Sequence, residues 1–79
     1  MKVVYLGVNE VEVVDRETNL NGLTLMIGKV VDPTFPDRPF LTICEEVEGG
    51  AYHTGHYDMN LMDAANDFYR RLGYLREDY

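Results

Sequence analysis

The chain has 79 residues, 46% of them hydrophobic and 11% aromatic, and its 14 acidic and 7 basic residues give a formal net charge of −7. This length suits one domain over residues 1–79, with too little interior for a deep cavity that excludes water. The mixed composition excludes a disordered segment, and the negative charge disfavours direct binding to nucleic acid or to anionic membranes.

The first two predicted strands lie near the N-terminus. Residues 2–8 are rich in β-branched and aromatic types, with apolar residues on both faces, which is typical of a central or two-sided strand. Residues 10–14 alternate between glutamate and valine and predict a half-buried strand. A helix over residues 8–20 is the alternative, because Asn9 and Glu12 have the spacing of a capping box, although four valines in seven residues argue against a helix.

The middle of the chain predicts a loop, a central strand and a second loop. Residues 15–22 are dense in turn formers and end in Asn21-Gly22, a strong signal for a hairpin tip. Residues 23–31 are the most apolar strand candidate, placed at the centre of the sheet, with Gly28 marking a bulge or a close backbone approach. Residues 32–39 contain all three prolines and predict a rigid connecting loop.

Residues 40–47 alternate once more and predict a strand, with Leu41, Ile43 and Val47 on one face and Thr42, Cys44 and Glu46 on the other. Gly49-Gly50 then predicts a tight turn into a strand over residues 51–57. In a simple hairpin, Val47 would face Tyr52, Glu46 would face His53 and Ile43 would face His56, and a slip of one residue would reverse every face.

From Asn60 onward the period changes to that of a helix, with an apolar row of Leu61, Ala65, Phe68 and Leu72 and a polar row of Asp63, Asp67 and Arg71. Asp58 or Asn60 is the expected N-cap, and Gly73 is the expected C-cap. The predicted fold class is α+β: a small antiparallel meander of four to five strands packed against one C-terminal helix.

Candidates for chemistry centre on the hairpin of residues 40–57. His53 and His56 are three apart, which would place them on opposite faces of a regular strand, so we expect no metal site and no cofactor. Cys44 is the only cysteine. It allows no internal disulfide, favours a reducing, cytoplasmic location, and is expected to be a small buried hydrophobe. The alternative function is a small-molecule or metal binder, or a minor enzyme, using Cys44, His53 and His56.

The N-terminal apolar run is too short for a secretory signal, and no stretch approaches the length of about 20 apolar residues that a membrane-spanning helix needs. We therefore expect neither a signal peptide nor an integral membrane protein.

Acidic and aromatic residues at the hairpins carry the leading functional hypothesis. Aromatic residues are enriched at the centres of protein interfaces, and negative patches steer basic partners. We expect a non-enzymatic protein that binds a larger protein through a basic patch, with homodimer formation as a further possibility. The expected partner-binding residues are Glu45, Glu46, Glu48, Tyr52, Glu10 and Glu12.

In size, charge and architecture, but in no specific motif, the chain resembles small phage or mobile-element proteins that block host or defence proteins. That resemblance implies an inhibitor that masks a nucleic-acid-binding surface of its partner.

Overall fold

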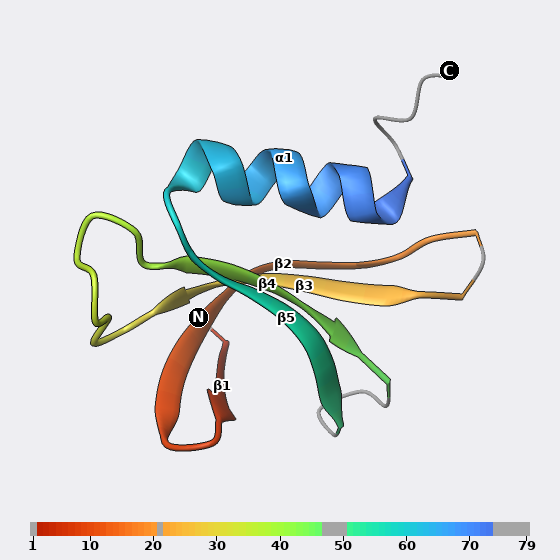
Figure 1. Cartoon of the computed structure of the whole chain (residues 1–79). Helices are drawn as coiled ribbons and strands as arrows, with labels where there is room; N and C mark the ends of the chain where they lie inside the picture. The colour runs from red at the N-terminus through yellow and green to blue at the C-terminus, as the bar shows by residue number, and fades with distance from the viewer. Residues whose placement is uncertain (1, 21, 47–50, 74–79) are drawn as a thin grey trace.

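The computed structural model describes residues 2–20, 22–46 and 51–73, which form one antiparallel sheet and one helix (Figure 1). The elements are β1 Val3–Leu6, β2 Asn9–Thr18, β3 Thr24–Val30, β4 Phe40–Glu45, β5 Tyr52–Met59 and α1 Leu61–Leu72. The strands follow one another in the order β1-β2-β3-β4-β5, which confirms the predicted meander. Helix α1 lies across one face of the sheet, and the β1–β2 and β4–β5 hairpins curve away from it (Figure 1).

Strand β1 is an edge strand, so the predicted central position of residues 2–8 is wrong. Among the described strands it pairs with β2 alone. It has four residues, because Gly7 adopts a positive φ of 66° and turns the chain directly into β2. Val4 and Leu6 are half-buried, whereas Val3 and Tyr5 are exposed on the other face. Apolar residues on both faces of β1 therefore do not make it a central strand, because one of its faces is exposed to water. The central strand is β3, as predicted.

Strand β2 runs through Thr18, which settles the strand against the helix alternative and shortens the predicted loop of residues 15–22. Its second half pairs with the first half of β3, and the hydroxyls of Thr18 and Thr24 lie 2.8 Å apart across the pair. The hairpin tip is confirmed beyond Thr18, where the Asn19 side chain accepts a hydrogen bond from the backbone of Leu23. Turn-forming residues were thus accommodated in a strand by cross-strand pairing.

The bulge in this part of the sheet lies in β2 rather than at Gly28. The register shifts between Val13 and Asp15, so Val14 is the extra residue and is 53% exposed. Gly28 faces Val13 across the pair, and a Cβ on Gly28 would lie 2.5 Å from a methyl carbon of Val11. Gly28 therefore provides the predicted close approach, without being the bulge itself.

Two apolar clusters occupy opposite faces of the sheet. One lies between the sheet and the helix and contains Leu25, Ile27, Cys44, Ala64, Phe68 and Leu72. The other lies on the face that α1 does not cover and contains Val11, Met26, Leu41 and Ile43. The predicted alternation of β4 accounts for both, because Leu41 and Ile43 point to one cluster and Cys44 to the other. Val47, predicted to share the face of Leu41, lies outside the described residues.

Helix α1 begins and ends as predicted. The Asn60 side chain accepts a hydrogen bond of 2.8 Å from the backbone N–H of Asp63, and Gly73 has a left-handed conformation at φ 88°. The buried row is Ala64, Phe68 and Leu72, so the expected inclusion of two other residues is wrong. Leu61 is 55% exposed, and Ala65 is half-buried. Among the described residues, no helix has the length and apolarity needed to cross a bilayer.

Candidate functional site

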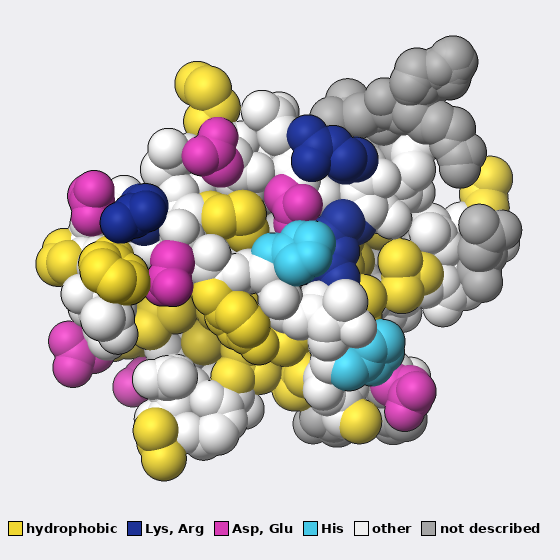
Figure 2. All heavy atoms as spheres, viewed as in Figure 1, with side chains coloured by type: hydrophobic (Ala, Val, Ile, Leu, Met, Phe, Trp, Pro, Cys, Tyr) yellow, Lys and Arg dark blue, Asp and Glu magenta, His cyan; other side chains and the backbone are white. Residues whose placement is uncertain are grey.

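A groove of about 700 Å³ lies on the face of the sheet opposite α1. Its floor is formed by Val11, Leu41 and Ile43, which belong to the second apolar cluster. Figure 2 shows hydrophobic side chains gathered in a hollow between two projecting parts of the molecule. The groove is an open concavity formed by the curvature of the sheet, and it differs from the deep cavity that excludes water, which is not expected in a chain of this length.

Two bulges in β5 shape one wall of this groove. The register shifts twice along the β4–β5 pair, so that Ile43 faces both Thr54 and Gly55, and Leu41 faces both Tyr57 and Asp58. Each bulge contains a non-glycine residue with positive φ, 55° at Thr54 and 58° at Asp58. Such conformations are unfavourable, and bulges next to functional sites often re-aim side chains.

The pairing of β4 with β5 differs from the register predicted for residues 51–57, and the bulge between His53 and His56 reverses the face predicted for His56. Cys44 faces His53, Glu45 faces Tyr52 and Thr42 faces His56, in place of the predicted pairing of Glu46 with His53 and Ile43 with His56. His53 and His56 lie opposite Cys44 and Thr42, residues of the helix-side face, so the two histidines share one face. The extra residue in the bulge between them cancels the alternation of a regular strand.

Tyr57 lies against the strand at Gly55. A Cβ on Gly55 would collide with the phenol ring of Tyr57, so glycine is needed for the ring to take this position. Tyr57 is 56% exposed and lines the groove together with its neighbour Asp58. Consecutive strand residues normally point to opposite faces, and the bulge is what allows both to line one groove.

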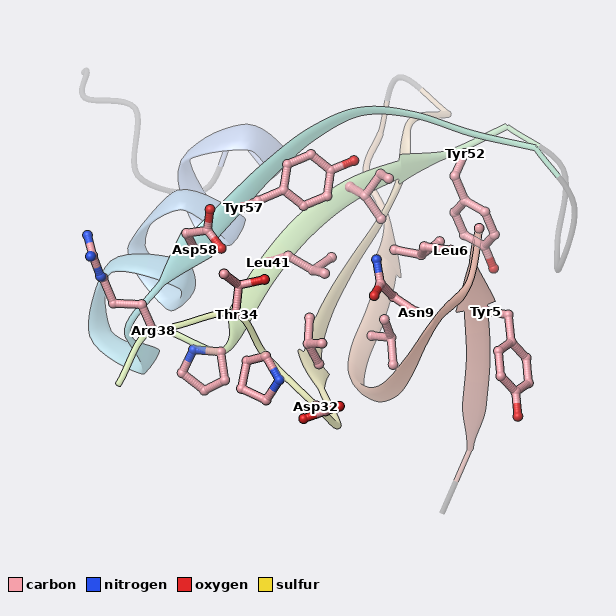
Figure 3. Close-up of a pocket in the computed structure, with 16 residues that line it drawn as sticks. Tyr5, Leu6, Asn9, Asp32, Thr34, Arg38, Leu41, Tyr52, Tyr57 and Asp58 are labelled. Carbon is pink, nitrogen blue, oxygen red and sulfur yellow. The ribbon is translucent and has the colours of Figure 1, made fainter. Parts of the chain in front are cut away.

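The two ends of the groove differ in chemistry. Figure 3 shows Asp58, Thr34 and Arg38 toward one end, and Leu6 and Tyr52 toward the other, with Leu41 between them. The guanidinium of Arg38 lies 5.0 Å from the centroid of the Phe35 ring, a cation–π contact. The groove therefore has a charged end and an apolar, aromatic end.

A buried ion pair lies next to Tyr52, at the aromatic end of the groove. Arg16 Nε lies 2.7 Å from Glu45 Oε1, with the Glu45 side chain fully buried and the Arg16 side chain 20% exposed. The contact is close, although the Arg16 N–H is not aligned for a hydrogen bond. Burial, and then the negative charge of Glu45, raise the pKa of the Tyr52 hydroxyl, and the charge of Arg16 opposes that shift. Tyr52 is thus fixed beside a pair of charges at the end of the groove.

A second polar cluster lies between the sheet and α1. The Asp67 carboxylate accepts a 2.6 Å hydrogen bond from the Thr42 hydroxyl and lies 2.9 Å from His56 Nδ1. Arg71 donates to the Thr42 hydroxyl and to the backbone oxygen of Thr54, and its Nη2 lies 3.2 Å from Cys44 Sγ. These contacts tie the helix to β4 and β5.

Two opposing effects in this cluster act on the pKa of Asp67. Burial acts to raise it, but the hydrogen bonds from Thr42 and His56 and the charges of His56 and Arg71 outweigh burial, so the pKa of Asp67 is lowered. The carboxylate is therefore held in its ionised form as a structural acceptor.

The hairpin of Cys44, His53 and His56 is built into this arrangement. Cys44 is 5% exposed, His56 contacts Asp67, and His53 Nδ1 lies 2.9 Å from the Thr54 hydroxyl. No group of three metal-ligating side chains occurs within residues 2–20, 22–46 and 51–73. Cys44 and His56 thus take part in the contacts between the sheet and α1, whereas His53 is exposed and contacts its neighbour Thr54.

The predicted partner-binding residues do not form one surface. Glu45 is buried in its ion pair, which removes it from the exposed patch expected at the hairpin tip, whereas Glu46 is exposed and Glu48 lies outside the described residues. Tyr52 lines the groove. Glu10 and Glu12 lie level with Val31 and Lys29, at the end of β3 remote from Glu45.

The sequence interpretation missed Tyr57 and Asp58 as members of a site. One signal for the two bulges was the spacing of His53, His56 and Met59, which are three residues apart. Each bulge adds one residue between two of them, so all three lie on the helix-side face. Gly55 within that run was a second signal, since an isolated glycine inside a strand often marks a bulge.

The fold and the groove define a class of protein: a five-stranded antiparallel meander with one covering helix and a concave open face. No family model, curated protein or solved structure matches the chain.

Proposed function

We propose that this protein is a non-enzymatic interaction module that binds a larger protein through the groove. The observation that carries the proposal is a concave, tyrosine-lined sheet face whose apolar floor α1 leaves open. Tyrosines beside an apolar floor and a polar rim are the composition expected at the centre of a protein interface.

The chemistry of the groove supports binding more than catalysis. Its titratable lining residues are tyrosines, two carboxylates and one arginine, whereas the cysteine and both histidines of the described chain are elsewhere. General acid–base catalysis at neutral pH usually employs a histidine, or a carboxylate with a strongly shifted pKa. The groove offers contact area and charge instead.

The net charge indicates the kind of partner. With a charge of −7, the chain attracts basic protein surfaces and repels nucleic acid. A partner that binds nucleic acid through a basic surface would then be masked, so that this protein acts as an inhibitor competing with nucleic acid, in the manner of small phage or mobile-element proteins. Exposed carboxylates such as Glu46 and Glu10 would add long-range attraction that salt screens.

A comparative pull-down tests this function. Tagged wild-type protein, Tyr57→Ser and the control Tyr69→Ser are used to capture proteins from the native host. Tyr69 is a matched control because it is 41% exposed on α1, away from the groove. We expect a protein that wild type and Tyr69→Ser retain, that Tyr57→Ser loses, and that elutes at raised ionic strength. Equal capture by all three proteins would refute the groove as the binding surface.

The volume of the groove favours one second candidate, a small-molecule binder. About 700 Å³ falls within the usual range of ligand pockets, and the expected location moves from the hairpin of Cys44, His53 and His56 to the groove. Chemical-shift titration with metabolite mixtures distinguishes the two candidates, because a small-molecule site must give saturable shifts at Tyr57 and Leu41 without any partner protein.

A further inference from the structure

We propose that the charged end of the groove receives a basic side chain, lysine or arginine, from an extended segment of the partner, while an apolar side chain of that segment lies toward Tyr52. The inference rests on the proposed function and specifies the chemistry of the partner. It is carried by the way β5 brings an aromatic ring and a carboxylate to the same wall.

Tyr57 and Asp58 are consecutive, yet both line the groove. This placement requires the bulge opposite Leu41 and the positive φ of 58° at Asp58, a conformation that non-glycine residues rarely adopt. A regular strand would have placed one of the two side chains on the helix side. The backbone is thus distorted at the two consecutive residues that supply an aromatic ring and a carboxylate to the groove.

A groove lined by an aromatic ring and a carboxylate is suited to a cation. A lysine or arginine can stack on the ring face and form a charge-assisted hydrogen bond with the carboxylate. Asp32 lines the same groove and adds a second negative charge. Within the described part of the chain, neither Asp32 nor Asp58 forms an ion pair with Arg38, whose guanidinium lies over Phe35. Both carboxylates therefore remain available to an incoming base.

The other end of the groove calls for an apolar residue. Leu6 and Tyr52 flank a floor that includes Val11 and Ile43, which are 0% and 3% exposed. The Tyr52 hydroxyl is buried, so this ring presents its apolar body to the groove. A segment with a basic residue and a nearby apolar residue would match both ends.

Charge also distinguishes this occupant from a second copy of the chain. Two copies would each bring a net charge of −7 to the interface, and the resulting repulsion opposes a homodimer. A basic segment instead meets a complementary field, which favours a different protein as the occupant.

Selection from a random library of displayed 12-residue peptides tests the inference directly. The full chain is used as bait in three forms: wild type, Asp58→Asn, and the control Asp63→Asn, which changes an exposed aspartate in the first turn of α1. We expect wild type to enrich peptides that carry lysine or arginine near an aliphatic or aromatic residue. Affinity of the enriched peptides should fall by about tenfold in Asp58→Asn, the loss of one charge-assisted contact, and stay unchanged in Asp63→Asn.

Each other outcome overturns the inference. Enriched peptides without a basic residue, equal affinity for Asp58→Asn, or no enrichment at all would each do so. Apolar peptides that still depend on Tyr57 would reject the basic side chain while supporting the groove as an interaction site. A dimer detected by light scattering, and abolished by Tyr57→Ser, would make a second copy the occupant. Failure of the proposed function itself is measured separately, by equal capture in the pull-down.

Discussion

Removing Arg16 should strongly destabilise the fold, because it leaves the Glu45 carboxylate buried without its counter-charge. The perturbation is Arg16→Met, which keeps the length and apolar stem of the side chain. Glu45 has no side-chain exposure, and its partner atom in Arg16 lies 2.7 Å away. Breaking a buried ion pair from one side costs about 3–5 kcal/mol.

The expected loss for Arg16→Met is at the lower end of that range, about 3 kcal/mol, because the Arg16 side chain keeps 20% exposure and water already screens the pair. A domain of this length has a free energy of unfolding of roughly 4–12 kcal/mol, so this loss is a large share of it. The triple variant Arg16→Met, Glu45→Leu, Tyr52→Phe removes both charges and the neighbouring hydroxyl. We expect it to lie within about 1 kcal/mol of the wild type.

Urea unfolding followed by circular dichroism measures these differences, with the m-value as a check on two-state behaviour. Arg70→Met is the matched control, because this arginine is 70% exposed and lies 4.0 Å from Asp67, a contact worth at most about 1 kcal/mol. The reasoning is refuted if Arg16→Met costs no more than Arg70→Met, or if the triple variant is as unstable as Arg16→Met alone.

Three further changes test the groove, the helix cluster and the core. Gly55→Ala should displace the exposed Tyr57 ring, reducing partner capture while urea unfolding changes by less than about 1 kcal/mol; unchanged capture would contradict this. The pKa of Asp67 is lower in the folded chain than in the unfolded chain, where it is about 3.9. The ionised carboxylate therefore stabilises the fold fully above the unfolded pKa, and this stabilisation is lost as the pH falls through the folded pKa. Asp67→Asn should therefore lose stability at pH 7 and show a weaker dependence below about pH 4, and an unchanged pH profile would argue against the contacts with Thr42. Phe68→Ala, at a position 2% exposed, should cost about 3–5 kcal/mol in thermal or urea unfolding, and a cost below about 1 kcal/mol would place Phe68 outside the core.

Local signals in the sequence were sufficient for most of the fold. The caps of α1 were predictable because Asn60 and Gly73 act through contacts within a few residues. The alternation of Leu41 and Ile43 with Thr42 and Cys44 assigned both faces of β4, since that strand is regular on its own side of the pairing.

The candidate site depended on features that periodicity does not contain. A bulge adds one residue and reverses the faces of the residues after it, so the two bulges in β5 changed the faces of His56 and Tyr57 without changing the composition of the strand. The burial of Glu45 could not be predicted from the sequence pattern either. It depends on Arg16, 29 positions away, in a segment whose turn-forming residues predicted a loop.

The two faces of the sheet differ in how completely the chain covers them, and the proposed binding function belongs to the less covered face. The helix-side face is covered by Phe68 and Leu72 and tied down by the Asp67 cluster, so its apolar area is already removed from water within the chain. On the groove face, Val11 and Leu41 are buried by partly buried side chains such as Leu6 and Tyr52, and they lie at the floor of an open concavity edged by the exposed Tyr57. Covering that concavity would bury the exposed part of its lining, including the Tyr57 ring, and each Å² of apolar surface removed from water contributes about 25 cal/mol. The bulges of β5 act on this open face, and they place Asp58 where a basic group approaching the groove would meet it.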